Sequence, residues 1–558
     1  MILNITLIYR SNEEMRLIIC ESHFFVVSLR QNQRLMGTYI NLGKAGFQSA
    51  RNSEYVDKSG LIAIVNKTLF TERRFSCVTR SRRFGKSLAA KMLCAYYDHS
   101  CDSRSLFADL EIAGNQSFEQ HLNKYAVLYL DMTNFMSDQH DEDIVAKVRH
   151  KLKSEVIMAY PGISASDDDD LMDTLLKAHV ATGDTFFFII DEWDAICREY
   201  PSDSVAMDDY VRWLRRMFKS VNANDVFAGV YMTGILPVKK YNTQSALNNF
   251  KEYSMVEPGD MGAFFGFTKD EVRMLAEKHS MDFNELEKWY DGYQIGDELS
   301  MFNPNSVMEA VSRRRCRSYW ASTGTYDAVA KYIKMNYHGL KDDIIRMLAG
   351  ERCKVNPTKF QNDMSIVRSK DDVFTVLIHL GYLSYNWRKD ECYIPNKEVS
   401  GEIVNAVEDN QWTPLVTALQ ASEQLLQSTL DGDVDAVARG IEKVHDENTS
   451  ILSYNNENSL ACVLSIAYYY AKNDYIIYRE LPTGKGFADL VFIPRKNVDL
   501  PAIIVELKVD KGADAAIDQI KRRQYPDKVK DYTGRLLLVG IVYDRQAKQH
   551  DCQIEKLC

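Results

Sequence analysis

The sequence predicts an α/β protein with an N-terminal domain built on a parallel sheet, a helical middle region and a C-terminal α/β domain. Short apolar, strand-like runs at 75–79, 126–131, 186–190 and 226–232 predict the first sheet. Two further runs, at 488–493 and 502–509, flank a turn-rich stretch and predict a β-hairpin near the C-terminus. Between these regions the pattern is mainly helical, as at 282–290 and 413–444.

The C-terminal hairpin carries a group of charged side chains. Asp489 lies at the start of the first strand, and Glu506 and Lys508 lie two residues apart on the second, so the latter two point to the same face. Charges gathered on one sheet face are costly unless they have a partner. Mg²⁺ prefers carboxylate oxygens, so Asp489 and Glu506 are candidate metal ligands, and Lys508 is a candidate for holding an attacking water.

These residues resemble the motif of the PD-(D/E)XK nuclease superfamily. The family order is a helix with Glu, a strand with Asp, a strand with Glu-x-Lys and a helix with Gln. The chain matches this order at Glu457, Asp489, Glu506, Lys508 and Gln519. The resemblance implies phosphodiester cleavage in which Glu457 and Gln519 orient the site. Related proteins usually carry Arg where this chain has Phe487, and a salt-bridged hairpin edge is the structural alternative.

A second candidate site begins after the run 75–79, where Gly85-Lys86-Ser87 leads into a helix-like segment at 88–97. In this setting the loop amides and the helix N-terminus face an anion, Lys86 reaches the β- and γ-phosphates, and the Ser87 hydroxyl binds Mg²⁺. The full Walker A pattern has Gly five residues before Gly85, whereas this chain has Arg80. We therefore expect an altered loop, in which Arg82 or Arg83 supplements the phosphate contacts.

A Walker B element supports the same site. The run 186–190 ends in Asp191, which would hold Mg²⁺ through water, and Glu192, which would polarise the hydrolytic water. One strand-like run lies between the two motifs, and the next after them ends in Thr233, a candidate sensor of the γ-phosphate. This order is that of the AAA-type (ASCE) branch of P-loop ATPases, so ATP and Mg²⁺ are the expected cofactors. The alternative is an ordinary α/β core with a surface Asp-Glu pair.

From residue 43 to 548 the chain resembles bacterial proteins that join an AAA-ATPase-like domain to a C-terminal PD-(D/E)XK nuclease domain. The predicted parts are an extension at 1–36, the ATPase-like domain at 37–255, a helical lid or connector at 256–450 and the nuclease-like domain at 451–558. The extension is either a loosely packed arm or a segment before the true start at Met36. In the connector no catalytic cluster is evident, and the aromatic stretch 289–293 is interpreted as a packed turn.

Composition limits the remaining choices. The net charge of −10 argues against a wholly basic nucleic-acid coat. Eleven cysteines without a CxxC pair, and the absence of an 18-residue apolar run, predict a cytoplasmic protein with reduced thiols and no membrane contact. The expected partners are nucleic acid, with DNA and RNA both open, and further copies of the chain. Two alternatives stay open: the nuclease-like domain only binds nucleic acid or protein, leaving a nucleotide-driven switch, or the ATPase half is a scaffold without turnover.

Overall fold

The computed structural model describes most of the chain. The described residues are 16–20, 23–27, 37–136, 143–201, 203–238, 240–241, 244–245, 247–296, 299–320, 326–335, 337–361, 367–409, 413–447, 457–483, 486–495, 498–510, 512–522, 529 and 535–557. None of the described helices combines the length and the apolar character that crossing a membrane requires. The described cysteines are free thiols, and most are buried, as the sequence predicts.

The chain forms two compact units. The first contains Met1–Val78, Gly85–Gly234 and Gln244–Glu252, and the second contains Thr79–Phe84, Ile235–Thr243 and Tyr253–Cys558. The limits of the four parts predicted from the sequence stay predictions. In the extension, the structure describes two antiparallel strands, β1 (Arg16–Cys20) and β2 (His23–Val27).

A five-stranded sheet forms the centre of the first unit, in the order β4-β5-β6-β3-β9. Its strands are β3 (Phe75–Thr79), β4 (Ala126–Asp131), β5 (Phe186–Asp191), β6 (Phe227–Gly234) and β9 (Lys251–Tyr253). β4, β5 and β6 are parallel neighbours. These strands are buried along nearly their whole length, which explains their continuous apolar sequences.

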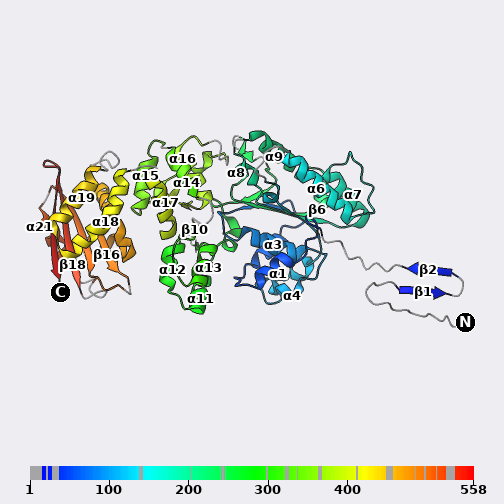
Figure 1. Cartoon of the computed structure of the whole chain (residues 1–558), viewed down its shortest axis with the longest axis horizontal. Helices are drawn as coiled ribbons and strands as arrows, with labels where there is room; N and C mark the ends of the chain where they lie inside the picture. Colours follow the sequence, from blue (N-terminus) through cyan, green and yellow to red (C-terminus); the bar gives the residue numbers. More distant parts are fainter. Residues whose placement is uncertain are drawn as a thin grey trace. The chain divides into compact units, whose positions relative to one another are not determined.

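Helices cover both faces of this sheet. Figure 1 shows α6, α7 and α9 on one side, with α1, α3 and α4 on the other. The helices of this unit are α1 (Ala45–Arg51), α2 (Gly60–Asn66), α3 (Lys86–Tyr97), α4 (Arg104–Phe107), α5 (Phe118–His121), α6 (Ile144–Ala159), α7 (Leu171–Thr182), α8 (Ala195–Glu199), α9 (Ser204–Phe218) and α10 (Ala223–Val226). The α/β class and the parallel sheet predicted from the sequence are confirmed.

The middle of the chain is mainly helical, as predicted, with several short strands that the sequence did not indicate. The helices are α11 (Lys269–His279), α12 (Phe283–Tyr290), α13 (Pro304–Arg313), α14 (Tyr326–Lys334), α15 (Leu340–Leu348), α16 (Lys370–Leu380), α17 (Lys397–Asp409), α18 (Thr413–Asp431) and α19 (Val434–Glu447). The short strands are β10 (Tyr293–Ile295), β11 (Leu299–Met301), β12 (Cys353–Lys354), β13 (Ser384–Asn386) and β14 (Glu391–Tyr393). Strands of two or three residues are too short to produce a readable alternation.

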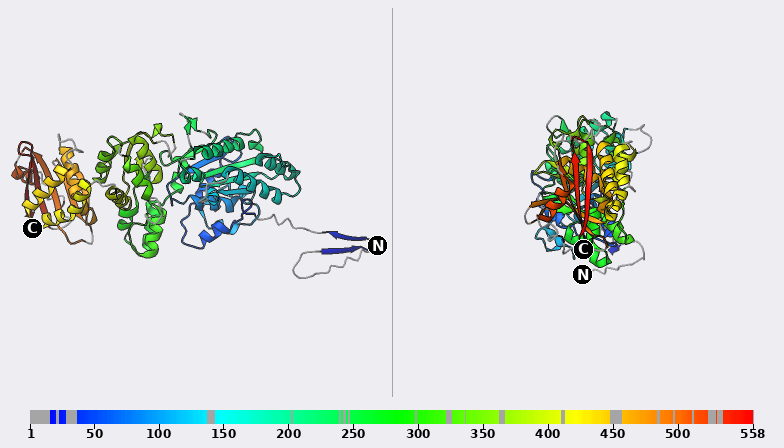
Figure 2. Two further views of the ribbon diagram at one scale, coloured as in Figure 1. Left: turned by 45° about the horizontal axis from the view of Figure 1, so that its top comes forward. Right: turned by 90° about the vertical axis from the view of Figure 1, so that its left-hand side faces the viewer.

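The C-terminal region is built on a second five-stranded sheet, in the order β15-β16-β17-β18-β19. Its elements are α20 (Glu457–Ala467), β15 (Tyr475–Thr483), β16 (Gly486–Pro494), β17 (Ala502–Val509), α21 (Ala513–Arg522), β18 (Leu536–Asp544) and β19 (Gln549–Leu557). β16 and β17 form the predicted antiparallel hairpin, and β17 and β18 are parallel. Helices α18 and α19, in yellow, lie along this sheet (Figures 1 and 2).

The two faces of this sheet have different partners. Ile504 and Leu538 share a hydrophobic cluster with Ile517 of α21. Val505, on the opposite face of β17, belongs to the larger core, which also contains Leu464 of α20. Because side chains alternate along a strand, Glu506 lies on the α21 face, next to Ile504.

Candidate functional site

The loop that follows β3, the candidate phosphate-binding loop, ends at Gly85, which is the N-cap of α3. Gly85 has φ of +89°, in the left-handed region where a side chain is unfavourable. Lys86 is the first residue of the helix and only 4% exposed. Burial lowers the pKa of Lys86 from its ordinary value, against the opposing effect of the nearby Glu192 carboxylate. An ammonium held in this way at a helix N-terminus is suited to receiving a phosphate, whose charge would compensate its burial.

Asp191 ends β5 beside this loop and is 2% exposed. Its carboxylate accepts a hydrogen bond from the Tyr129 hydroxyl at 3.1 Å and, in parallel register, lies next to Asp131. The pKa of Asp191 is raised to about 6: burial is the largest cause, a hydrogen bond from Ser87 opposes it, and the charges of Glu192 and Asp131 add to the rise. Ser87, Tyr129, Asp131 and Asp191 line a cavity of about 260 Å³. The predicted juxtaposition of Ser87 and Asp191 is therefore present in the structure.

Glu192 lies between two cations. Its Oε1 atom is 3.8 Å from Lys86 Nζ, and its Oε2 atom is 2.5 Å from an Arg198 nitrogen. Arg198, on α8, also lies 3.2 Å from the carboxylate of Asp194, which is fully buried. Glu192 has φ of +50°, so the backbone turns sharply directly after β5. No motif in the sequence predicts that Arg198 belongs to this group.

Thr233 lies near the end of β6, the strand between β3 and β5. Its carbonyl accepts a hydrogen bond from the Trp193 amide at 2.9 Å. Its hydroxyl is buried and has no hydrogen-bond partner among the described residues. The position next to the Walker B strand is compatible with the predicted sensor role, which stays a prediction.

Arg80 replaces the first glycine of the usual loop and has a structural role. Its guanidinium is completely buried, donates to the backbone carbonyls of Thr79 and Tyr253, and lies over the ring of Phe265. It is thus bonded to backbone rather than presented to a ligand.

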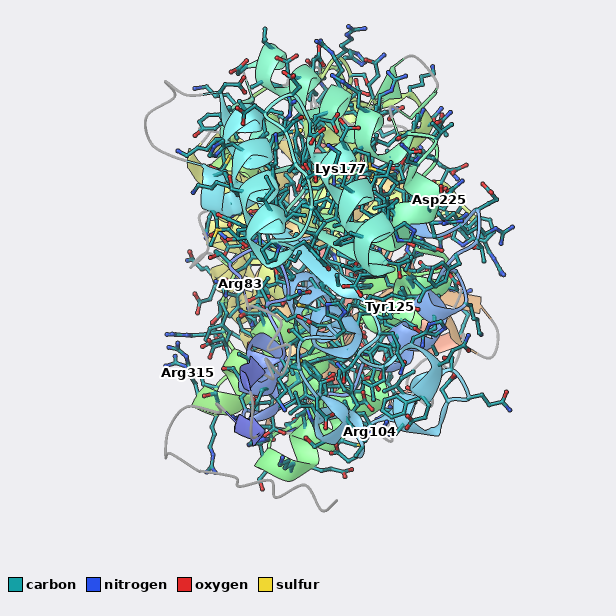
Figure 3. The ribbon with its side chains drawn as sticks, turned by 90° about the vertical axis from the view of Figure 1, so that its right-hand side faces the viewer. Arg83, Arg104, Tyr125, Lys177, Asp225 and Arg315 are labelled. Carbon is teal, nitrogen blue, oxygen red and sulfur yellow. The ribbon has the colours of Figure 1, made fainter. Side chains whose placement is uncertain are left out.

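Arg82 and Arg83 follow in the same loop. Arg82 is half-buried, and Arg83 is exposed with φ of +68° (Figure 3). Their contribution to phosphate contacts stays a prediction.

The C-terminal charged residues meet on one face of the second sheet. The β16–β17 ladder ends at the pair Leu490–Val505, so Asp489 and Glu506 are the next residues on the two strands. The Leu507 amide donates to Asp489 Oδ2 at 2.7 Å. Lys508 Nζ lies 3.1 Å from Glu506 Oε1. The sequence prediction that the two carboxylates and the ammonium come together is therefore supported by the geometry.

Gln519 completes this group from α21. Its side-chain amide donates to the same Oε1 atom of Glu506. Glu506 is 1% exposed and Lys508 is 9% exposed, so both charges are largely removed from water. Glu457 begins α20, but its side chain lies outside the described residues.

The carboxylates of Asp489 and Glu506 supply some, but not all, of the oxygen ligands that a hard cation needs. Carboxylates are the kind of ligands that Mg²⁺ takes together with waters and substrate phosphate oxygens. Among the described residues, no group of three or more His, Cys, Asp or Glu side chains could hold a metal ion. A metal at Asp489 and Glu506 would therefore depend on ligands beyond these two side chains.

Comparisons with known proteins match the N-terminal and C-terminal parts of the chain to two different families. Residues 43–243 match the family model described as predicted AAA-ATPase, and residues 455–551 match the PD-(D/E)XK nuclease superfamily. The chain thus carries an AAA-ATPase-like domain and a C-terminal domain of the PD-(D/E)XK nuclease superfamily. Both parts of the predicted resemblance are confirmed.

Two individual proteins are also similar. The "Uncharacterized protein in vnfD 5′ region" of Azotobacter chroococcum is 24% identical over 277 residues, 49% of this chain. The chain spans about half (51%) of the length of that relative. The structure of the ORC2 protein of Aeropyrum pernix (ADPNP–ADP complexes) aligns with 66% of this chain and 97% of that one, at 12% identity and a TM-score of 0.30.

Proposed function

We propose that the chain is an ATP-hydrolysing AAA-like protein whose C-terminal domain cleaves nucleic acid with the aid of Mg²⁺. The observation that carries this proposal is the convergence of Asp489, Glu506, Lys508 and Gln519 from β16, β17 and α21. Charged side chains are rarely gathered and buried in this way without a function. The match to the nuclease superfamily supports the same assignment.

The residues of this site have separable roles in the proposed cleavage. Asp489 and Glu506 would hold Mg²⁺, which when bound supplies charge stabilisation for a phosphodiester under attack. Lys508, whose Nζ lies 3.1 Å from Glu506 Oε1, would hold a water near the carboxylate. Gln519 donates to Glu506 and fixes the orientation of that carboxylate. The hydrogen bond from the Leu507 amide does the same for Asp489.

In the ATPase-like domain, Lys86 would bind the phosphates, and Ser87 and Asp191 would hold the accompanying Mg²⁺. Glu192 would orient the hydrolytic water. Its carboxylate is directed by Lys86 on one side and by Arg198 on the other. These contacts limit the rotation of the Glu192 side chain, which supports this proposed role.

One observation favours a second candidate function, a nucleotide-dependent switch or scaffold whose nuclease-like domain only binds nucleic acid or protein. Glu506 already accepts from both Lys508 and Gln519, as a structural ion pair would. In that case the group stabilises the fold and supports no cleavage.

Cleavage of labelled DNA and RNA by the full chain, with and without ATP and with Mg²⁺ or EDTA, distinguishes the two functions. We expect Mg²⁺-dependent cleavage that is lost in Glu506→Gln, which keeps the shape of the side chain. Asp514→Asn, which alters an exposed carboxylate on α21, is the matched control and should cleave like wild type. Absence of cleavage in wild type under all conditions, or equal activity in Glu506→Gln, would reject the nuclease assignment.

A further inference from the structure

A large cavity lies in the second unit, away from the charged group of β16 and β17. It has a volume of about 670 Å³, within the range of small-molecule sites. Its wall combines residues of α12, α17 and the 3-10 helix η6 (Tyr469–Asn473) with Arg495, just after β16. Neither the proposed ATP hydrolysis nor the proposed cleavage uses this cavity.

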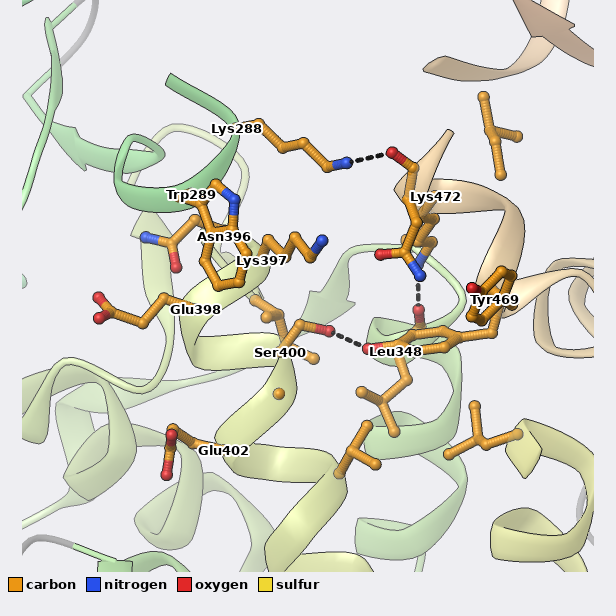
Figure 4. Close-up of a pocket in the computed structure, with 18 of the residues that line it drawn as sticks. Lys288, Trp289, Leu348, Asn396, Lys397, Glu398, Ser400, Glu402, Tyr469 and Lys472 are labelled. Carbon is orange, nitrogen blue, oxygen red and sulfur yellow. Dashed lines mark hydrogen bonds between the residues drawn. The ribbon is translucent and has the colours of Figure 1, made fainter. Parts of the chain in front are cut away.

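Four cationic side chains line the cavity: Lys288, Lys397, Lys472 and Arg495. None of them forms a salt bridge with a carboxylate among the described residues. Lys288 donates to the Asn473 carbonyl at 2.8 Å, and Lys472 donates to the Leu348 carbonyl at 2.6 Å (Figure 4). The Nε atom of Arg495 is buried without a hydrogen-bond partner. Several positive charges are therefore concentrated in one cavity, where Lys288 and Lys472 contact backbone carbonyls and Asp474 and Glu285 are nearby acidic groups.

Two of these lysines, Lys288 and Lys472, have a lowered pKa, which reflects the electrostatic cost of this arrangement. The pKa of Lys288 is lowered to about 7, chiefly by burial and in addition by the nearby charges of Lys397 and Arg495. Burial also lowers the pKa of Lys472 to about 8. A bound anion would reduce this cost, because Asp474 and Glu285 do not restore the ordinary pKa of Lys288 and an anion would add counter-charge inside the cavity.

Aromatic rings and two acids complete the wall. Lys397 Nζ lies 4.5 Å from the centre of the Trp289 ring, and Lys472 Nζ lies 4.8 Å from that of Tyr469. On the far side of Trp289 from the cations, Figure 4 shows Glu398 and Glu402. Each of these carboxylates has a buried Oε2 atom without a hydrogen-bond partner. The cavity thus offers a cationic end, planar surfaces for stacking and hydrogen-bond acceptors.

We propose that this cavity binds a nucleoside phosphate. The phosphate would contact Lys288, Lys397 and Arg495, the base would stack on Trp289, and an exocyclic amino group would reach Glu398 or Glu402. The combination distinguishes this ligand class from inorganic phosphate, which would leave the rings and acceptors unused, and from an uncharged nucleoside, which would leave the cations uncompensated.

Calorimetric titration of the full chain tests the proposal. The chain carries Lys86→Ala to remove the nucleotide site of the first unit, and EDTA excludes metal-dependent binding at the nuclease-like site. The probes are AMP, GMP, CMP and UMP, with adenosine and inorganic phosphate as comparisons. We expect at least one of the four monophosphates to bind, with adenosine and inorganic phosphate each about tenfold weaker or more.

Variants locate the binding in the cavity. Lys288→Met and Arg495→Met should each weaken monophosphate binding about tenfold, whereas Lys278→Met, at an exposed lysine of α11, should not. Trp289→Leu should also weaken it, whereas the same change at Trp387, which is 50% exposed, should not. The proposal is overturned if no monophosphate binds, if adenosine or inorganic phosphate binds as tightly, or if the folded cavity variants bind like their controls.

Discussion

The guanidinium of Arg198 lies 2.5 Å from the carboxylate of Glu192, the residue that directly follows the Walker B aspartate. The same guanidinium lies 3.2 Å from the fully buried Asp194. Arg198 thus joins two carboxylates on the turn after β5, and one of them is the candidate for water activation. A single cation therefore links the stability of this turn to the position of Glu192.

Replacement of Arg198 should affect both properties. In Arg198→Met the buried carboxylate of Asp194 loses its guanidinium partner. We expect the free energy of unfolding to fall by roughly 3 kcal/mol and Tm by several degrees. Arg198→Lys keeps the charge but cannot contact both carboxylates with a planar fork, so it should restore Tm in part and still lower kcat for ATP with little change in KM. Arg212→Lys, at an exposed position of α9, is the control. Unchanged melting and ATPase activity in Arg198→Met would contradict the linking role.

The candidate nucleotide site predicts two distinct phenotypes. Lys86→Ala removes the buried ammonium at the start of α3, so ATP binding should be lost. Glu192→Gln keeps the shape of the side chain and removes its charge, so ATP should still bind while hydrolysis stops. Binding is measured by calorimetry with Mg²⁺·ATP and hydrolysis by phosphate release. Equal ATP affinity in wild type and Lys86→Ala would show that nucleotide binds elsewhere.

Gly234, at the end of β6, should tolerate no side chain. A Cβ atom there would lie 2.5 Å from Asp194 Oδ1 and 2.6 Å from a Trp193 ring atom. Both neighbours are buried, so Gly234→Ala should destabilise the first unit by about 1–3 kcal/mol, measured by thermal melting. Gly114→Ala is the matched control, because its Cβ would meet no atom within 4 Å. Equal Tm values for the two variants would show that the Asp194 turn can move aside.

Much of this fold could be predicted because its strands are continuous apolar runs. β3 and β17 have the same limits in the sequence prediction and in the structure, since both are buried over almost their full length. The site residues followed from the same elements. Asp191 ends a buried parallel strand, and Glu506 and Lys508 share a face because strand side chains alternate. Asp131, in register with Asp191, could have been found in the same way.

Other features depend on contacts that no local pattern records. The turn that brings Glu192 and Arg198 together has a positive φ at Glu192, a conformation that usually favours Gly or Asn, so a glutamate there gives no local signal of it. The cavity cations lie between residues 288 and 495, and each resembles an ordinary surface lysine or arginine. The aromatic sequence around Trp289 predicts a packed turn. Its neighbours Tyr290 and Tyr293 are fully buried, whereas Trp289 lines the cavity.

The ion pair of Glu506 predicts a stability effect that is independent of cleavage. Lys508→Met removes the ammonium 3.1 Å from a carboxylate that is 1% exposed, so it should destabilise the C-terminal domain by roughly 3 kcal/mol without metal. Glu506→Gln removes the charge instead and should cost less. Thermal melting in EDTA, with Asp514→Asn as control, compares them. If Lys508→Met melts like wild type, the pair contributes little to the fold, and its burial is better explained by a role in binding or catalysis.

The lowered pKa of Lys288 predicts how stability depends on pH. Lys397 and Arg495 face Lys288 with like charge, and Asp474 and Glu285 oppose them without restoring its ordinary pKa. Lys472, Glu398 and Glu402 line the same cavity. Because the pKa of Lys288 is about 7 in the folded chain and 10.5 is its ordinary value, the unfolded chain binds more protons between these limits. Lys288 therefore destabilises the folded chain, fully so below pH 7. This destabilisation decreases as the pH rises from about 7 to 10.5.

Lys288→Met removes a group that titrates in this window, so the variant should be more stable than wild type at pH 7. The difference should shrink as the pH approaches 10, where Lys288 is neutral in the folded chain and its charge is disappearing in the unfolded one. Urea unfolding of the full chain at several pH values between 6.5 and 10 measures it, with Lys278→Met as control at an exposed lysine. A constant difference across this range, or a difference of opposite sign at pH 7, would show that Lys288 keeps its ordinary charge in the cavity.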